Sequence, residues 1–138
     1  MTESELADLF SGPRTVAVVG LSADSTRPSY GVAAVMQRAG YRIIPVNPRY
    51  VGQVILGEPC IATLADADAP IDIVDCFRRS EDMPEIAIAA AALSPRPRVL
   101  WMQIGVQNAV AAQTARDAGL AVVENKCLKI EYLARHGR

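Results

Sequence analysis

Short apolar runs alternate with helical patterns along the whole chain, and this alternation limits the possible folds more than any other feature. The runs are rich in Val and Ile, which is typical of strands that are buried on both faces of a sheet. Strands that alternate with helices form parallel βαβ units with right-handed crossovers. The pattern therefore predicts an α/β fold with a doubly wound, mainly parallel five-stranded sheet flanked by helices. The predicted strands are 15–20, 42–46, 71–76, 98–103 and 120–123.

Helices are predicted between the strands and at both ends of the chain. Segment 1–12 is expected to hold an N-terminal helix, because it opens with the capping-box sequence Thr2-Glu3-Ser4-Glu5. A loop or short hairpin is predicted over 51–59, and one or two helical turns over 61–68. Residues 135–138, which contain His136, are expected to form a flexible tail of this single domain, 1–138. The remaining predicted helices are 29–39, 81–93, 108–118 and 128–134.

Composition excludes several classes of protein. The 138 residues carry a formal net charge of −1, which gives no electrostatic reason to expect nucleic acid or an anionic membrane as a partner. The three cysteines have no C-x-x-C spacing, which argues against a disulfide framework and a zinc site. The N-terminus is polar, and no apolar run is long enough to span a membrane. We therefore expect a cytoplasmic protein without a metal site.

The turn after the first predicted strand is a candidate phosphate site. The strand ends at Gly20, a polar loop follows, and a helical pattern opens at Pro28-Ser29. Glycine lets the backbone approach a ligand closely, and a helix N-terminus offers unpaired N–H groups and a positive dipole end. Arg27 adds a guanidinium group whose planar fork suits phosphate. The alternative is an ordinary strand-to-helix turn with Arg27 in solvent.

Polar, cationic or glycine residues follow every predicted strand. The carboxyl ends of parallel strands lie at one edge of a sheet, and ligands bind there in doubly wound folds. We therefore expect these segments to converge on one crevice. They are Gly20-Leu21-Ser22, Asn47-Pro48-Arg49, Phe77-Arg78-Arg79, Gln103-Ile104-Gly105 and Glu124-Asn125-Lys126.

These residues favour a ligand with a phosphate on its ribose. The G-x-G-x-x-G fingerprint is absent, because Gly20 is the only glycine between the first strand and Gly31. Sites for NAD usually place a carboxylate after the second strand, whereas this chain places Asn47-Pro48-Arg49 there and so offers a cation. NADP, coenzyme A (CoA) and related phosphorylated adenylates remain as candidates.

Six short motifs, in this order, closely resemble those of the small single-domain CoA-binding proteins. That family is similar to the N-terminal domain of the succinyl-CoA synthetase α subunit and of ADP-forming acyl-CoA synthetases. The resemblance covers roughly residues 13–134 and implies a Rossmann-like fold with CoA as its cofactor. The motifs are Gly20-Leu21-Ser22, Arg27-Pro28-Ser29-Tyr30-Gly31-Val32, Pro45-Val46-Asn47-Pro48, Ile73-Val74-Asp75-Cys76-Phe77-Arg78-Arg79, Trp101-Met102-Gln103-Ile104-Gly105-Val106 and Cys127-Leu128-Lys129.

The resemblance also implies roles for residues at matching positions. Phosphates would be held by Gly20, Ser22, Arg27 and Ser29, and the adenosine would lie beside Asn47 and Pro48. The remaining path would be lined by Val74, Phe77, Arg78 and Gln103. The other cofactor-binding candidates, which are neighbours of these residues, are Leu21, Tyr30, Arg49 and Gly105.

The sequence gives no sign of catalysis. The synthetases carry their phosphorylated histidine in a further domain, and the only histidine here is His136. No nucleophile elbow or Ser/His/Asp pairing is recognisable. We therefore expect a non-catalytic protein that binds CoA or an acyl-CoA as a sensor, carrier or accessory of acyl-CoA metabolism. The alternatives are an NADP-dependent reductase and a regulatory interaction module without ligand. The Ala-rich helical segments favour a homodimer, and an acyl-CoA enzyme is the other expected partner.

Three individual residues keep more than one interpretation, and two adjacent arginines are expected to differ in environment. Asp75 lies inside an apolar strand, where it would cap a neighbouring helix or hold an arginine such as Arg78. Cys127 is either a small buried side chain or a thiol near the crevice that could pair with the thiol of the ligand. Trp101 belongs to the core or to a subunit contact. Of the adjacent Arg78 and Arg79, we expect one at the site and one in solvent.

Overall fold

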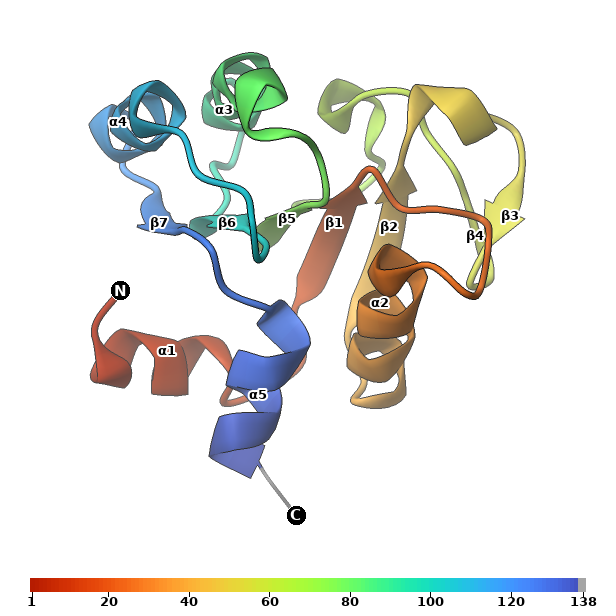
Figure 1. Ribbon diagram of the computed structural model, residues 1–138, viewed down its shortest axis with the longest axis horizontal. Helices are drawn as coiled ribbons and strands as arrows, with labels where there is room; N and C mark the ends of the chain where they lie inside the picture. Colours follow the sequence, from red (N-terminus) through yellow and green to blue (C-terminus); the bar gives the residue numbers. More distant parts are fainter. Residues whose placement is uncertain (137–138) are drawn as a thin grey trace.

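The computed structural model describes residues 1–136 and is built on a five-stranded parallel sheet (Figure 1). Its strands lie in the order β2-β1-β5-β6-β7. This confirms the predicted doubly wound, Rossmann-like α/β class, and each predicted strand is present within two residues of its expected bounds. The strands are β1 (Thr15–Val19), β2 (Arg42–Val46), β5 (Ile73–Cys76), β6 (Val99–Met102) and β7 (Ala121–Val123).

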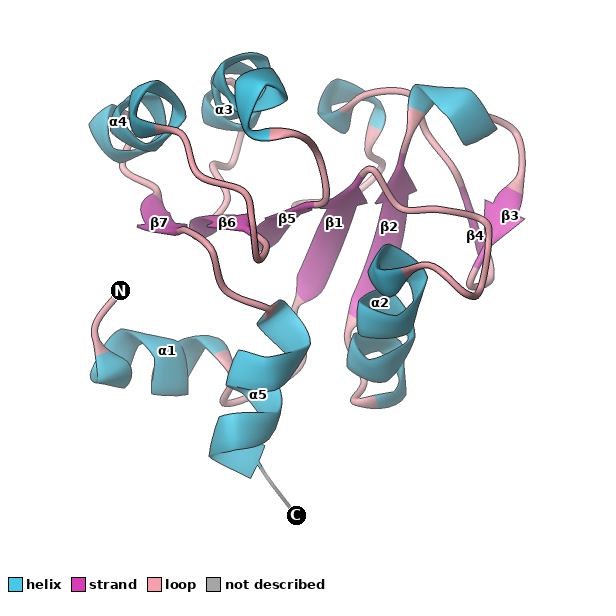
Figure 2. Cartoon of the chain, in the orientation of Figure 1, coloured by secondary structure: helices cyan, strands magenta, loops and turns pink. Residues whose placement is uncertain are grey.

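Helices cover both faces of the sheet (Figure 2). On one face lie α1 (Glu3–Leu9), α2 (Pro28–Arg38) and α5 (Leu128–His136). On the other lie α3 (Met83–Ala91) and α4 (Ala109–Asp117). Each face has its own apolar cluster, because side chains of a strand point alternately to opposite sides.

The order of the strands places a topological switch point between β1 and β5. Counted within this sheet alone, the strand order is 2-1-3-4-5, and the chain leaves β1 toward β2 on one side and later returns to β5 on the other. In doubly wound sheets the ligand crevice opens at this point, beyond the carboxyl ends of the strands. A ligand site is therefore expected beside the loops after β1 and β5.

β2 is an edge strand of this sheet, and this position explains its proline. Pro45 lies in register with Val18 of β1, and its carbonyl accepts from the Ile61 amide at 3.0 Å on the outer side. The polar groups of Pro45 therefore face away from β1, where the missing N–H costs no bond to that strand. Beyond β2 the predicted short hairpin is present as β3 (Val54–Ile55) and β4 (Glu58–Pro59). The predicted helical turn after it is the 3₁₀ segment Leu64–Asp66.

The end of the described chain differs from its prediction as a flexible tail. Arg135 donates to Glu3 at 2.7 Å and to Glu131 at 3.3 Å, and its side chain is only 16% exposed. His136 stacks on Tyr132, with ring centroids 4.4 Å apart, and its Nε2 lies 2.8 Å from the Phe10 carbonyl oxygen. These contacts extend α5 to His136, while the rest of the predicted tail, 137–138, lies outside the described residues.

Residues 1–136 show neither a candidate membrane span nor a candidate metal cluster. None of the helices there combines the length and the apolar character needed to cross a membrane. The same residues contain no group of three or more His, Cys, Asp or Glu side chains that could hold a metal ion.

Candidate functional site

Gly20 ends the first strand and brings two loops of the carboxyl edge into contact. Its φ of 88° lies in the left-handed region that favours glycine. Its N–H donates to the Val46 carbonyl at 2.8 Å. A Cβ at this position would lie 2.3 Å from the Phe77 carbonyl oxygen. The loops after β1 and β5 therefore meet at the switch point with no room for a side chain at Gly20.

The loop after Gly20 is shaped by its own hydrogen bonds. Ser29 Oγ accepts from the Ser22 amide at 3.0 Å, and this buried hydroxyl ties the loop to the first turn of α2. Ser22 Oγ accepts from the Asp24 amide at 3.0 Å. The hydroxyl and the amide of Thr26 both donate to the Asp24 carboxylate. These two bonds, the one from the hydroxyl most of all, lower the pKa of the Asp24 carboxyl group. The conformation of the loop is therefore fixed by its own hydrogen bonds.

The N-terminus of α2 adds a positive field to this loop. Its N-cap, Arg27, makes no side-chain capping hydrogen bond with any residue of 1–136, and its first turn contains no acidic residue. The N-terminal end of the helix dipole is therefore available to an anion. The Arg27 side chain is 70% exposed, and its guanidinium lies 4.0 Å from the Asp24 carboxylate. This weak surface pair leaves the guanidinium accessible to a phosphate.

Asn47 fastens the loop after β2 to the loop after β1. Its Nδ2 donates to the Leu21 carbonyl at 3.1 Å, and its Oδ1 accepts from the Arg49 amide at 3.0 Å. The Arg49 side chain is exposed, and its guanidinium carbon lies 5.6 Å from the centre of the Tyr50 ring. A second arginine is thus held at the same edge of the sheet as Arg27.

These residues surround a cavity of about 490 Å³, which we call the turn cavity. It combines both arginines with the start of α2 and one carboxylate, that of Asp24. The grouping supports the prediction that the first turn and the loop after the second strand share one crevice. The predicted site residues that line the turn cavity are Gly20, Ser22, Arg27, Ser29, Asn47, Arg49 and Phe77.

A larger cavity of about 830 Å³ adjoins the first, and we call it the arm cavity. Pro28 and Phe77 line both cavities, so the two lie side by side at the carboxyl edge. Val32 of α2 and the buried Val106 contribute apolar walls. The other predicted site residues that line the arm cavity are Arg78, Gln103 and Gly105.

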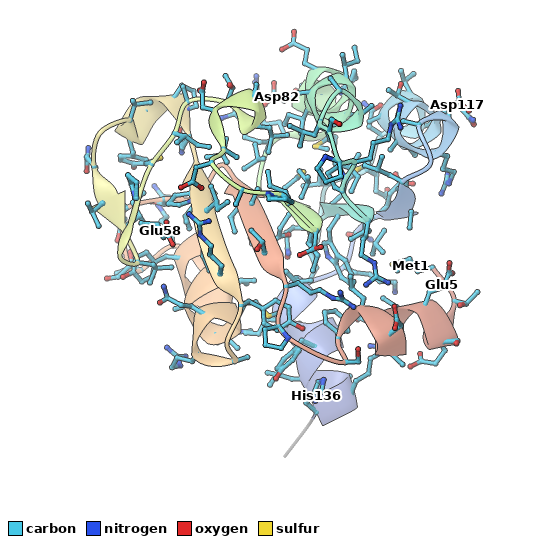
Figure 3. The ribbon with its side chains drawn as sticks, turned by 180° about the vertical axis from the view of Figure 1, so that it is seen from behind. Met1, Glu5, Glu58, Asp82, Asp117 and His136 are labelled. Carbon is cyan, nitrogen blue, oxygen red and sulfur yellow. The ribbon has the colours of Figure 1, made fainter. Side chains whose placement is uncertain are left out.

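Asp82 holds both arginines that follow β5. Arg79 donates to its carboxylate at 3.2 Å and Arg78 at 3.4 Å. The hydrogen bond from Arg79 is the largest cause of the lowered pKa of this carboxyl group. Both arginines border the arm cavity, but the side chain of Arg79 is 73% exposed and that of Arg78 is 38% exposed, so the expected division between site and solvent is met in part. Figure 3 shows Asp82 at this edge, beside the start of α3.

Asp75 has a different partner from either of the two predicted ones. Its Oδ1 accepts from Gln103 Nε2 at 2.6 Å, and its Oδ2 has no hydrogen-bond partner within residues 1–136. Arg78 pairs with Asp82 instead, so the predicted Asp75–Arg78 pair is wrong. Full burial is the main cause that raises the pKa of Asp75 to about 7, and the bond from Gln103 opposes this rise.

Four predicted site residues lie apart from the two cavities. The side chains of Leu21 and Val74 are fully buried in the core, so their side chains cannot contact a ligand. Tyr30 packs against the core on the α2 face. Pro48 lines a separate hollow of about 270 Å³ on the α3 side of the sheet. The sequence motifs show which turns lie at the site, but they do not show which side chains of a turn point toward the cavities.

Two residues that the sequence left open are now placed. Trp101 is fully buried, and its Nε1 donates to the Lys126 carbonyl at 2.8 Å, which makes it a core residue. Cys127 is both buried and part of the arm-cavity wall, so each of its two interpretations is partly met.

Tyr50 and Asp82 also line the cavities but were not among the predicted site residues. Their positions in the sequence could have indicated both, because Tyr50 follows Arg49 and Asp82 pairs with Arg78 four residues before it.

Known proteins are similar to this chain in sequence and share its fold. An uncharacterized Bacillus subtilis protein, YneT, is 37% identical over 131 residues, which make up 95% of this chain and 94% of that protein. A solved Thermus thermophilus protein, cell-free ID.343, shares 33% identity with a TM-score of 0.92, over 98% of this chain and 99% of that one.

A more distant structural neighbour is a much larger enzyme. The solved apo form of a dinucleotide-forming acetyl-coenzyme A synthetase 1 from Ca. Korarchaeum cryptofilum shares 17% identity with a TM-score of 0.67. The match covers 85% of this chain and 27% of that chain, and at this identity it shows a common fold. The family model described as CoA binding domain matches residues 14–133, which contain every residue of both cavities. The chain therefore belongs to the CoA-binding domain family.

Proposed function

We propose that this protein binds CoA or an acyl-CoA along the turn and arm cavities and does not act on it chemically. The main support for the proposal is that a cavity lined by arginines and a cavity with apolar walls lie side by side and share Pro28 and Phe77. CoA joins a phosphorylated adenosine diphosphate to a long uncharged arm. The turn cavity offers guanidinium groups and a helix N-terminus for phosphates, and the arm cavity offers apolar walls with a few polar groups.

The non-catalytic part of the proposal rests on the placement of reactive groups. The only histidine, His136, lies on α5 at the end of the molecule opposite to Asp82 and the carboxyl edge (Figure 3). The residues that line the two cavities include one thiol, Cys127, and no histidine. Hydrolysis or transfer of an acyl thioester by the pure protein would contradict this part of the proposal.

The physiological role that fits a binding domain is that of a sensor, a carrier or an accessory of an acyl-CoA enzyme. Mass spectrometry of the protein under native conditions tests the proposal directly, because a retained CoA species would be weighed with the chain. Calorimetric titration with CoA, acetyl-CoA and NADPH then ranks the candidate ligands. No heat from any CoA species would instead favour a regulatory module without ligand, and tighter binding of NADPH would favour the reductase.

Arg27→Ala is expected to weaken CoA binding by about 2 kcal/mol, because a charge-assisted contact to phosphate is lost. The side chain is exposed on a loop, so the free energy of unfolding should stay within about 0.5 kcal/mol of the parent value. Arg116→Ala, at the exposed end of α4, is the matched control and should bind as the parent does. Equal affinities of the Arg27 variant and the parent, measured by calorimetry, would remove Arg27 from the site.

Dephospho-CoA, which lacks only the 3′-phosphate, is expected to bind about tenfold more weakly than CoA, the scale of one charge-assisted contact. The physical reason is the accessible Arg49 guanidinium at the turn cavity. The difference should narrow as salt rises, since exposed charges are screened. In Arg49→Ala, both ligands should bind alike. A full tenfold difference that persists in this variant would show that another group contacts the phosphate.

A further inference from the structure

Asp75 is a buried carboxyl group directly beneath a residue of the arm cavity. Its side chain is fully buried on β5, and only one of its two oxygens has a hydrogen-bond partner within residues 1–136. That partner, Gln103, is 4% exposed and lines the arm cavity. An isolated carboxylate in a core is costly unless it is paired. Packing alone therefore does not explain why a carboxyl group occupies this position.

Within residues 1–136 no positively charged side chain bonds to Asp75, and none contributes to the shift of its pKa. On β1 and β6 the residues in register with it are Val18 and Trp101. On this face of the sheet α1, α2 and α5 build a mainly apolar cluster, which also holds the titratable groups of Tyr41, Cys60 and Cys127 and borders the buried hydroxyl of Ser29. On its own strand the neighbour is Cys76, whose thiol has a raised pKa caused first by burial and then by the charge of Asp75. The charge state of Asp75 is thus set by its burial and by Gln103, with a pKa of about 7.

The charge state of Asp75 decides which end of the Gln103 amide faces the cavity. An ionised carboxylate only accepts hydrogen bonds, so Gln103 must present its Nε2 to Asp75, as it does at 2.6 Å. The amide oxygen Oε1 is then left for the cavity. A protonated Asp75 can instead donate to Oε1, and the amide can turn its NH₂ group toward the cavity.

We propose that Asp75 is a positioning residue whose ionised form fixes Gln103 with its carbonyl oxygen toward the arm cavity, where it accepts from an N–H or S–H group on the arm of CoA. The inference rests on the proposed function, because it assigns the arm of CoA to this cavity. The arm carries two amide N–H groups and, in free CoA, a thiol, so it offers such donors. Binding then favours the ionised form, and CoA releases the proton of Asp75 when it binds near neutral pH.

The coupling between CoA binding and proton binding at Asp75 gives the sign of the pH dependence of CoA affinity. A ligand that prefers ionised Asp75 binds more weakly as the pH falls through the titration range of that group. One neutral hydrogen bond corresponds to roughly fivefold in affinity. We therefore expect the affinity for CoA to fall roughly fivefold more in the parent protein than in Asp75→Asn between pH 8.5 and pH 5.5. The asparagine keeps the shape of the side chain and an oxygen for Gln103, but it does not titrate.

The test is a calorimetric titration of both proteins with CoA across this pH range, each in two buffers of different ionisation enthalpy. Phosphate and thiol groups of the ligand titrate equally in both experiments, so the ratio of the two affinities isolates Asp75. Near pH 7 the parent should release more protons on binding than the variant does. If the variant were unstable, a carboxyl ¹³C titration of the parent with and without CoA would follow Asp75 alone, and its midpoint should fall when CoA is bound.

A second pair of variants separates positioning from a merely structural role. In the Gln103→Met background, Asp75→Asn should no longer change the pH dependence of binding, because the amide that transmits the charge is gone. Parallel pH profiles of the parent and Asp75→Asn, with equal proton release, would overturn the inference while leaving the proposed function intact. Absence of CoA binding at every pH in the parent would overturn both.

Discussion

Gly20→Ala is expected to lower the free energy of unfolding by about 3 kcal/mol, because the new side chain combines backbone strain with a steric clash. The φ of 88° is unfavourable for any residue with a Cβ. The added carbon would also lie 2.3 Å from the Phe77 carbonyl oxygen and 3.0 Å from Cδ of Arg78. The side chain of Arg78 can move, but the carbonyl belongs to the backbone, so the loops after β1 and β5 must separate.

Gly31→Ala is the matched control for this substitution. Gly31 lies in α2, and a Cβ there would meet nothing within 4 Å. Alanine inside a helix is favoured over glycine, so this variant should gain roughly 0.5–1 kcal/mol. Urea unfolding of the three proteins measures both changes. A Gly20 variant as stable as the parent would mean that the switch point can widen without cost, and its CoA affinity would then show whether the close approach serves the ligand.

The fold was predictable because its signals are local and repeated. Apolar runs rich in Val and Ile, separated by helical patterns, allow few arrangements other than a parallel, doubly wound sheet. The predicted strand ends also located the carboxyl edge, and hence Arg27, Asn47 and Arg49 around one cavity. Such an inference needs only the direction of each strand and the end at which its loop begins.

The direction of individual side chains was not predictable in the same way. Gly20-Leu21-Ser22 is one turn, yet Leu21 enters the core while the flanking residues line the turn cavity. Val74 alternates with Asp75 on one strand, so each faces a different layer of the molecule. The partners of Asp75 and Arg78 are 28 and 4 residues away along the chain, and the pairing depends on how β6 and α3 pack. Sequence spacing alone contains no information on that packing.

Asp75→Asn is expected to stabilise the protein increasingly as the pH rises, by about 4 kcal/mol between pH 4 and pH 8 relative to the parent. The folded state holds the pKa of Asp75 at about 7 because the carboxyl group is fully buried. In the unfolded chain an aspartate titrates near 3.9. Between these values the folded state keeps a proton that the unfolded state has released, so the stability of the parent falls as the pH rises through this window. Three pKa units correspond to about 4 kcal/mol.

The difference between the two proteins is the quantity to measure, because other carboxyl groups act in the opposite direction. The pKa of Asp8 is lowered by the hydrogen bond from Arg98, and that of Asp82 by Arg79, so both groups stabilise the fold as the pH rises through their titration. These contributions are common to the parent and the variant and cancel in the difference. Urea unfolding at pH 4, 6 and 8 gives the curve, and a carboxyl ¹³C titration of the parent gives the midpoint for Asp75.

A constant difference in stability from pH 4 to pH 8 would show that Asp75 titrates normally in the folded protein and would remove the basis for a pH-dependent orientation of Gln103. A rising difference would mean that the protein keeps a carboxylate at neutral pH where an isosteric amide would be more stable. Such a cost persists where a group serves binding rather than folding. Asparagine would satisfy the hydrogen bond from Gln103 equally well. What it lacks is a charge that can fix the orientation of the amide toward the cavity and respond to a ligand there.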